Sequence, residues 1–441
     1  MRGLARGDEG YRETISRVHR RSAERLLRVF QTNRGVYIKA GQYLAALNHV
    51  LPVEFTSTFS VLNDQAPSSS WSDVEQLFRE DFGGRHPDDV FDDFERKPIA
   101  AASLAQVHRA KTKAGRPVAV KLQYPFLARS VGADFATAEA IVRALEWYFP
   151  DGFSFGFILP EMRKVISREL DFTLEGRNAD RTGANFGHDA RIRVPEVLWD
   201  LTTSRVLTME FVNGFKITDR EAMERAGINV QQVSELLLEM YCEQIFRDGF
   251  VHADPHPGNL LVEPGPVLVL LDHGCVQELT DEFRNDYANL WVALFLRDVA
   301  GMKEYTRRLG LGDQYELFSI LLTSKSMEAS EVGLGRQMTR EELKALRRKI
   351  HASIDELNEL LANVPDQLYL ILKANNIVRS INKQLGTDVN RFLYMAYYAH
   401  ATASNTHRVA SSVAFHVALA AAVALSPARV EAAVHALDFE F

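Results

Sequence analysis

The sequence is poor in cysteine and has no excess of positive charge. Its 441 residues include only two cysteines, Cys242 and Cys275, and neither lies in a C-x-x-C or disulfide-like spacing. A disulfide-based scaffold and a cysteine zinc site are therefore not expected. The formal net charge of −7 argues against a protein that binds nucleic acid by neutralising phosphates. We expect no nucleic-acid partner.

Long apolar runs are scarce as well, and no secretory signal is visible. The N-terminus is rich in arginine but also contains acidic residues, which makes it a poor transit peptide. Residues 11–32 are instead interpreted as an exposed amphipathic helix. The alanine-rich run 409–425 barely reaches the ~20 residues that span a bilayer. It is interpreted as a packed or interfacial helix, with a membrane span as the alternative.

The chain contains helical sequence at both ends and strand sequence between them. At ~150 residues per domain its length suggests two or three lobes. Residues 11–90 are predicted to be helical, with a capping box at Ser72 and Glu75. Further helices are expected over 128–149, 160–186 and 230–248, and from Gly274 onward. Strands are expected at 105–110 and 116–122, which form a hairpin around residues 114–115, and at 205–211, 260–262 and 267–271.

Lys121 lies within Val118-Ala-Val-Lys-Leu122, a close variant of the V-A-I-K strand of protein kinases. In strand period, Val118 and Val120 face one side, whereas Ala119 and Lys121 face the other. The ammonium group can then point into a cleft and bind nucleotide phosphates. The alternative is a solvent-facing lysine on an edge strand.

Two later segments supply carboxylate and amide groups in the order found in kinases. Asp254 and Asn259 have the spacing of the kinase catalytic loop H-R-D-x-x-x-x-N. Asp272 follows an apolar strand in Asp272-His273-Gly274, where a carboxylate suits Mg²⁺. Each motif alone could be an ordinary turn, but the three together predict a site for ATP and Mg²⁺.

A glycine-rich phosphate loop is absent before Lys121. An alanine-rich segment with less conformational freedom stands in its place, and it would alter nucleotide preference or slow transfer to protein substrates. The residues predicted to contact nucleotide there are Ala100, Ala101, Ala102 and Ser103.

Four segments, two of them described above, resemble the signature motifs of the AarF/UbiB family of atypical kinases. The motifs are Lys39-Ala-Gly-Gln42, Ala100–Val107, Glu169-Leu-Asp171 and Val251–Asn259. The mitochondrial AarF-domain-containing kinase 1 branch is the most similar, on the segments Leu271–Gly274, Glu282–Arg284 and Met302–Tyr305. The resemblance covers nearly the whole chain. It implies an α+β, atypical protein-kinase-like two-lobed fold with an N-terminal helical extension.

The resemblance also implies roles for single residues. Lys121 would pair with Glu175, Asn259 and Asp272 would hold magnesium, and Asp254 would be the catalytic carboxylate. Glu210 and Val212 would form a hinge-like nucleotide-binding segment. Lys39, counted among the catalytic residues, would approach the regulatory pair Glu169 and Asp171, with Gln42 beside it, and block a peptide groove. Without the resemblance, Lys39 is a cation at a helix end and the acidic pair is a solvated helix face.

The expected organisation has four segments: a helical extension over 1–94, a small lobe over 95–212, a large lobe over 213–408 and a helical tail over 409–441. The resemblance implies a mitochondrial protein tied to cristae or to lipid and ubiquinone homeostasis. A lipid or membrane surface and a mitochondrial protein would be its partners, beside nucleotide. The predicted activity is slow ATP hydrolysis or phosphorylation of a small, lipid-linked molecule. The alternatives are a pseudokinase scaffold and, with no A-P-E-like segment to hold a peptide, a Ser/Thr protein kinase.

Overall fold

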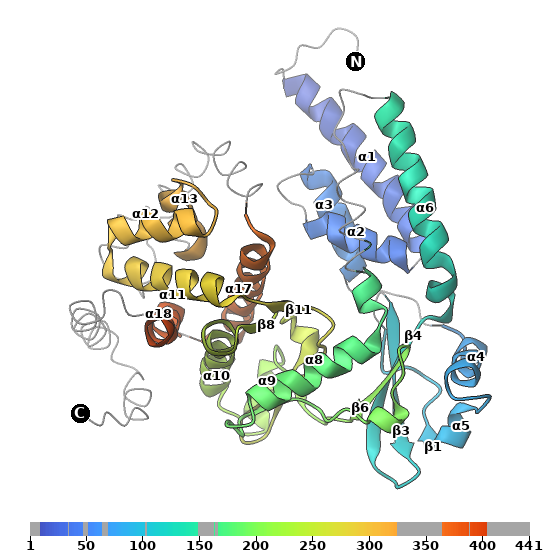
Figure 1. Ribbon diagram of the computed structural model, residues 1–441. Coiled ribbons are helices and arrows are strands. Elements are labelled where there is room, and N and C mark those ends of the chain that lie inside the picture. Colours follow the sequence, from blue (N-terminus) through green and yellow to red (C-terminus); the bar gives the residue numbers. More distant parts are fainter. Residues whose placement is uncertain are drawn as a thin grey trace. The chain divides into compact units, whose positions relative to one another are not determined.

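The computed structural model (Figure 1) describes residues 9–33, 35–46, 52–63, 69–101, 104–148, 163, 166–323, 364–387 and 389–403. Two compact units divide the chain. Unit 1 comprises residues 1–183, 194–213 and 272–274, and unit 2 comprises 184–193, 214–271 and 275–441. The four-segment division expected from the sequence stays a prediction.

Unit 1 contains an antiparallel sheet whose order is β1-β3-β4-β6, with β2 paired to β3. The predicted hairpin is confirmed, because β3 and β4 pair in register and place Val107 opposite Lys121. Gly115 closes the turn with φ +81°, a conformation that glycine adopts without strain. The strands are β1 Phe91–Phe94, β2 Ala100–Ala101, β3 Ala105–Thr112, β4 Pro117–Gln123 and β6 Val206–Glu210.

The two faces of β4 carry different side chains, apolar ones on one face and Lys121 on the other. Val118, Val120 and Leu122 are buried against the aromatic residues of β1 and of α4 (Trp71–Asp81). Lys121 faces the other side, as the strand period predicted. The helix α5 (Pro87–Val90) leads into β1.

The predicted capping box at Ser72 and Glu75 is wrong. The helix α4 begins two residues earlier, and Ser70 forms the box with Asp73, each side chain accepting the other's backbone N–H. Both pairs fit the S-x-x-[D/E] pattern. Val74, Leu77 and Phe78 lie on one face of α4 at helical spacing, and all three are buried.

The N-terminal helices pack on one another in unit 1 (Figure 1). The predicted helix over 11–32 is confirmed as α1. Gly41 lets α2 approach its neighbours, because a Cβ there would lie 2.2 Å from Leu62 and 2.9 Å from Phe30. The elements are α1 Glu9–Asn33, α2 Val36–Ala46, α3 Val53–Phe59, the 3₁₀ turn η1 Ser60–Asn63 and α6 Pro125–Tyr148.

The helix predicted over 160–186 is interrupted. Residues 166–169 are helical, Leu170 and Asp171 are not, and α8 then runs over Phe172–Asn185. The carboxylate of Asp171 accepts hydrogen bonds from the backbone N and the hydroxyl of Thr173, at 3.0 and 2.7 Å. Aspartate competes with helical hydrogen bonding in this way and favours helix starts. A 3₁₀ turn, η2 Trp199–Leu201, precedes β6.

Unit 2 contains a four-stranded sheet of order β5-β10-β9-β7 and a two-stranded ladder of β8 and β11. The strands are β5 Ile192–Arg193, β7 Phe215–Lys216, β8 Phe250–His252, β9 Leu260–Glu263, β10 Val267–Leu270 and β11 Val276–Glu278. The strand β11 corrects the expectation of helix directly after Gly274. Its residues show no strand alternation of their own, and pairing with β8 makes them extended.

Helices make up the rest of unit 2. The helix predicted over 230–248 is α10, which continues as one π-helical turn and ends at Gly249, φ +60°. The elements are α9 Arg220–Arg225, α10 Val230–Cys242, η3 Glu243–Asp248, η4 Pro257–Asn259, α11 Asp281–Leu296, α12 Val299–Arg308, α13 Tyr315–Thr323, α17 Asp366–Leu385 and α18 Arg391–Thr402.

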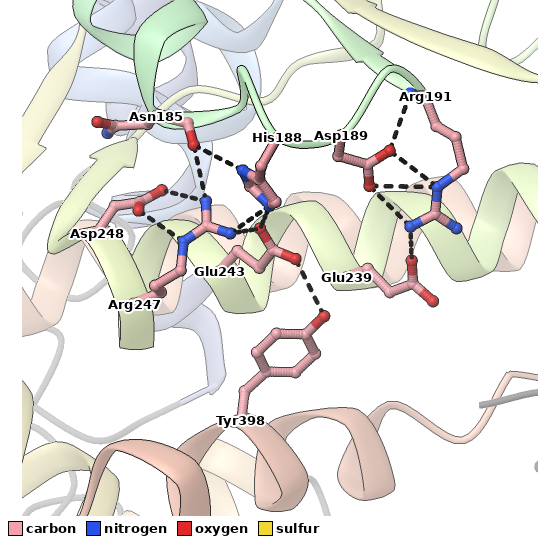
Figure 2. Close-up of polar contacts among 9 residues, drawn as sticks. All are labelled: Asn185, His188, Asp189, Arg191, Glu239, Glu243, Arg247, Asp248 and Tyr398. Carbon is pink, nitrogen blue, oxygen red and sulfur yellow. Dashed lines mark hydrogen bonds and ion pairs between the residues drawn. The ribbon is translucent and has the colours of Figure 1, made fainter. Parts of the chain in front are cut away.

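Two arginines tie the segment 185–191 to α10 and η3 (Figure 2). Arg247 contacts Glu243, Asp248 at 2.8 Å and the carbonyl of Asn185 at 3.1 Å. Arg191 bridges Asp189 and Glu239 at 2.7 and 3.0 Å in the same way. These contacts fix the loop before β5.

Among the described residues, no helix has both the length and the apolar character needed to cross a membrane. The run 409–425, predicted to be an apolar helix, lies outside those residues.

Candidate functional site

Lys121 is the centre of a charged cluster in unit 1. Its Nζ lies 2.6 Å from Glu175 Oε1 and 2.9 Å from Asp272 Oδ2. β4 is an inner strand, paired with β3 and β6, and the lysine side chain is 13% exposed. The alternative of a solvent-facing lysine on an edge strand is therefore excluded. The Lys121 ammonium also lies 5.3 Å from the ring centre of Phe172.

The cluster has more negative than positive charge. Burial raises the pKa of Glu175 to about 7; the charge of Asp272 raises it further, whereas the charge and hydrogen bond of Lys121 lower it. Burial by itself would lower the pKa of Lys121, but the charges of Asp272 and Glu175 outweigh burial and raise that pKa. One ammonium group thus serves two carboxylates. Since Asp272 is 38% exposed, it is the member of the cluster that a solvent cation can reach.

The backbone around Asp272 packs closely on its own carboxylate. Asp272 Oδ1 accepts a hydrogen bond from the N–H of Gly274 at 2.9 Å. A Cβ on Gly274 would lie 3.2 Å from that same oxygen. His273 is fully buried, and its carbonyl accepts from Asn178 of α8 at 3.0 Å. The segment is therefore held between β4 and α8, with the carboxylate facing Lys121.

The alanine-rich segment contributes a short exposed strand. Ala100 and Ala101 form β2, opposite Val107 and Gln106 of β3. Ala102 and Ser103 lie outside the described residues.

A buried hydrogen-bond chain beneath β2 was missed from the sequence. Gln106 Oε1 accepts from the N–H of Ser69 at 2.7 Å, and its Nε2 lies 3.0 Å from His108 Nε2. His108 Nδ1 lies 2.7 Å from the carbonyl of Glu95. With Gln106 donating to Nε2, the imidazole is neutral and donates through Nδ1. Desolvation lowers the pKa of His108. Gln106 and His108 are two residues apart, so strand period places them on one face of β3, but their other partners come from distant segments.

Lys39 of α2 lies 2.6 Å from Glu169, and this places the N-terminal helices against the segment before α8. Gln42 donates to the carbonyl of Leu62 at 2.9 Å. Asp171 caps α8 as described above. Lys39 does lie near the start of α2, and its charge is in addition used in a contact with a segment far away in the sequence.

The segment after β6 is the predicted hinge. Glu210 ends β6 opposite Val118, and its N–H donates to the carbonyl of Glu196 at 2.9 Å. Val212 follows and is buried. These two residues lie in unit 1, on the strand beside β4 and just after it.

The predicted catalytic loop lies in unit 2, between β8 and β9. The Nδ2 of Asn259 donates to the carbonyl of Asp254 at 3.1 Å, which directs its amide oxygen away from that carbonyl. The carbonyl of Asn259 accepts from Leu271 at 3.0 Å. Asp254 Oδ1 lies 3.1 Å from Lys373 Nζ of α17. No feature of the sequence near Asp254 pointed to Lys373.

The structure therefore gathers the predicted residues into three groups. Lys121, Glu175 and Asp272 form one, Lys39 and Glu169 the second, and Asp254 and Asn259 the third. The first two lie in unit 1 and the third in unit 2.

Comparison with known proteins places these groups in a family. The structure of Rv3197 with erythromycin, from Mycobacterium tuberculosis, superposes with a TM-score of 0.56 at 22% identity, covering 89% of this chain and 98% of that one. The profile of the "ABC1 atypical kinase-like domain" matches residues 61–306. Together the two matches show an α+β, atypical kinase-like fold.

Close relatives extend the match over most of the chain. AarF domain-containing protein kinase 1 of Mus musculus is 44% identical over 404 residues, which cover 90% of this chain and 77% of the relative. AarF domain-containing kinase 1 of Drosophila melanogaster is 40% identical over 384 residues, covering 86% and 74%. The chain belongs to the ABC1/AarF family of atypical kinase-like proteins, as the sequence motifs indicated.

Proposed function

We propose that the chain binds Mg-ATP and catalyses slow phosphoryl transfer, either as an ATPase or as a kinase of a small, lipid-linked molecule. The observation that carries this proposal is the buried position of Lys121 between Glu175 and Asp272. Phosphoryl transfer needs a fixed cation for the phosphates and a carboxylate for the metal. A lysine kept in place by two carboxylates meets the first need and leaves one carboxylate exposed for the second.

The donor chemistry of these residues fits Mg²⁺, a hard ion that takes carboxylate and amide oxygens. Asp272 has a partly exposed carboxylate, and Asn259 uses its amide nitrogen on its own loop and keeps the oxygen for a ligand. Bound Mg²⁺ would neutralise charge on the phosphates. Lys121 would orient the phosphates, Ala100–Ser103 and Glu210–Val212 would contact the nucleotide, and Asp254 would accept the proton of the attacking hydroxyl.

Nucleotide binding is tested by thermal unfolding of the intact chain with and without Mg-ATP. Ligand at 100 times its dissociation constant should stabilise by about 2.7 kcal/mol. The shift should need magnesium and should be lost in Asp272→Asn. The matched control is Asp92→Asn, which removes an exposed carboxylate from β1 of the same unit. No shift in the parent at millimolar Mg-ATP would reject the enzyme function.

Activity is tested by phosphate release from Mg-ATP with and without anionic lipid vesicles or detergent. Stimulated hydrolysis that Asp254→Asn removes would support a lipid-linked acceptor. Phosphorylation of generic Ser/Thr peptides would instead support a protein kinase. The helix α11 begins at Asp281, shortly after Gly274, which leaves little chain for a peptide platform.

The proposed setting is the mitochondrion, with a role in cristae organisation or in lipid and ubiquinone homeostasis. It is supported by the family membership and by the similarity to AarF domain-containing kinase 1 proteins. Fractionation of cells that express the tagged chain tests it, and a signal outside mitochondria would contradict it. A membrane surface and a mitochondrial protein are the expected partners.

A second function, a pseudokinase scaffold, is favoured by the ion pair of Lys39 and Glu169. This pair fixes the N-terminal helices against the chain before α8, which is how a regulator would hold one conformation. Nucleotide would then act as a conformational ligand. Mg-ATP binding without any Asp254-dependent turnover would select this function.

A further inference from the structure

The carboxylate of Asp254 lies beside an ammonium group from a distant part of the sequence. Lys373 of α17 brings Nζ to 3.1 Å from Asp254 Oδ1. The two side chains are 39% and 40% exposed. An ion pair so open to solvent adds little to stability. Its position at the predicted catalytic carboxylate is therefore the notable feature.

The catalytic loop does not supply a cation of its own. Residues 252–259 contain neither lysine nor arginine. His256, two positions after Asp254, serves the loop itself, since its Nδ1 accepts from the N–H of Gly258 at 3.2 Å. The backbone N–H of His256 donates to the carbonyl of Asp254 at 2.7 Å. The imidazole thus closes the turn, and the cation beside the carboxylate comes from α17.

The helix α17 is held in a position that keeps Lys373 in place. The hydroxyl of Tyr241, a fully buried residue of α10, donates to the carbonyl of Ile371 at 2.7 Å. Ile371 and Ala374 on either side of Lys373 are completely buried. Burial by itself lowers the pKa of Lys373, but the charge of Asp254 prevails and raises it, so that the ammonium form persists.

We propose that Lys373 is a positioning residue for Asp254, which keeps the carboxylate aimed at the acceptor. This inference rests on the proposed phosphoryl transfer. In that reaction Asp254 takes the proton of the attacking water or hydroxyl while the oxygen of that water or hydroxyl bonds to the γ-phosphorus. The bond from the γ-phosphorus to the bridging oxygen breaks, and its electron pair leaves with ADP. The ammonium group of Lys373, 3.1 Å from Asp254 Oδ1, holds the carboxylate in place until the acceptor arrives.

The test compares Lys373→Met, Lys373→Arg and the parent chain in steady-state hydrolysis of Mg-ATP. The control is Lys383→Met, the same substitution at an exposed lysine in the last turn of α17. We expect kcat to fall about 10- to 100-fold in Lys373→Met, because a charge-assisted hydrogen bond to the catalytic carboxylate is lost. The Mg-ATP thermal shift and the Tm without ligand should stay near the parent's. Arginine should restore much of kcat, and the control should behave as the parent.

Three results would overturn the inference. The first is a parent-like kcat in Lys373→Met, and the second is an equal loss in Lys383→Met. The third is a loss of the Mg-ATP shift itself in Lys373→Met, which would make Lys373 a nucleotide ligand. A parent chain without Mg-ATP turnover would overturn the proposed function and this role together, whereas an active parent with an unaffected Lys373→Met would overturn this role alone.

Discussion

Replacing Glu175 by glutamine should stabilise the folded protein at alkaline pH while it weakens the nucleotide site. Glu175 is only 5% exposed and shares one lysine with Asp272. Its pKa is raised from 4.5 to about 7, mainly by burial. The folded state therefore holds one more proton than the unfolded state between these two values. Stability from this group is fully present at low pH and is lost as the pH rises through about 7.

The size of the effect follows from the difference between the two pKa values. Each unit corresponds to about 1.4 kcal/mol, so ionised Glu175 costs about 3 kcal/mol at pH 8. Glutamine has the same shape and no charge to bury. The variant should therefore be more stable than the parent by up to about 3 kcal/mol at pH 8, and the difference should shrink toward pH 5.

The same substitution should reduce Mg-ATP binding. Without Glu175, Lys121 would keep Asp272 as its carboxylate partner in the cluster, and Asp272 is the carboxylate proposed to bind magnesium. Denaturant unfolding of both proteins from pH 5 to 8.5 measures the stability difference, and thermal shifts with Mg-ATP measure binding. Asp92→Asn serves as the exposed control. The reasoning would be refuted if the free energies of unfolding of the two proteins changed in parallel with pH, or if the variant were less stable than the parent at pH 8.

Three further outcomes are expected. Gly274→Ala should weaken the Mg-ATP shift with little change in Tm, because the added Cβ would crowd the Asp272 carboxylate at 3.2 Å; an unchanged shift would contradict the geometry. The pKa of His108 is lowered, so its contribution to the free energy of unfolding is full above about pH 6.5 and is lost as the pH falls. In the Glu175→Gln background, His108→Asn should therefore reduce the loss of stability that remains as the pH is lowered. Arg247→Met should destabilise by about 2 kcal/mol in denaturant unfolding, because two largely buried carboxylates lose their arginine (Figure 2); a change below about 0.5 kcal/mol would show the cluster to be energetically neutral.

The sequence predicted well wherever the signal was local. The period of two in Val118–Leu122 predicts that the valines and Lys121 face opposite sides of the strand, and the structure has that alternation. The hairpin followed from the short turn between two strand-forming segments. The family was identified from spaced motifs, and the domain match and relatives confirmed it.

The predictions were wrong where the local sequence fitted two helix starts, or both helix and strand, nearly equally well. Ser70 and Ser72 both begin an S-x-x-[D/E] pattern, and the structure uses the first of them. β11 has too few residues for a visible alternation and is extended because β8 pairs with it. The break at Asp171 depends on a side-chain cap that a long helical pattern conceals.

By itself the sequence determined the class of protein and named most of the residues that we propose carry its chemistry. Repeating backbone geometry and fixed motif spacing are local properties, and they are legible in the order of residues. Only the tertiary structure decided that Lys121 faces two carboxylates, that Lys39 contacts Glu169 and that Lys373 reaches Asp254. Each of these contacts joins segments far apart in the chain, and which charges meet depends on how separate helices and strands pack.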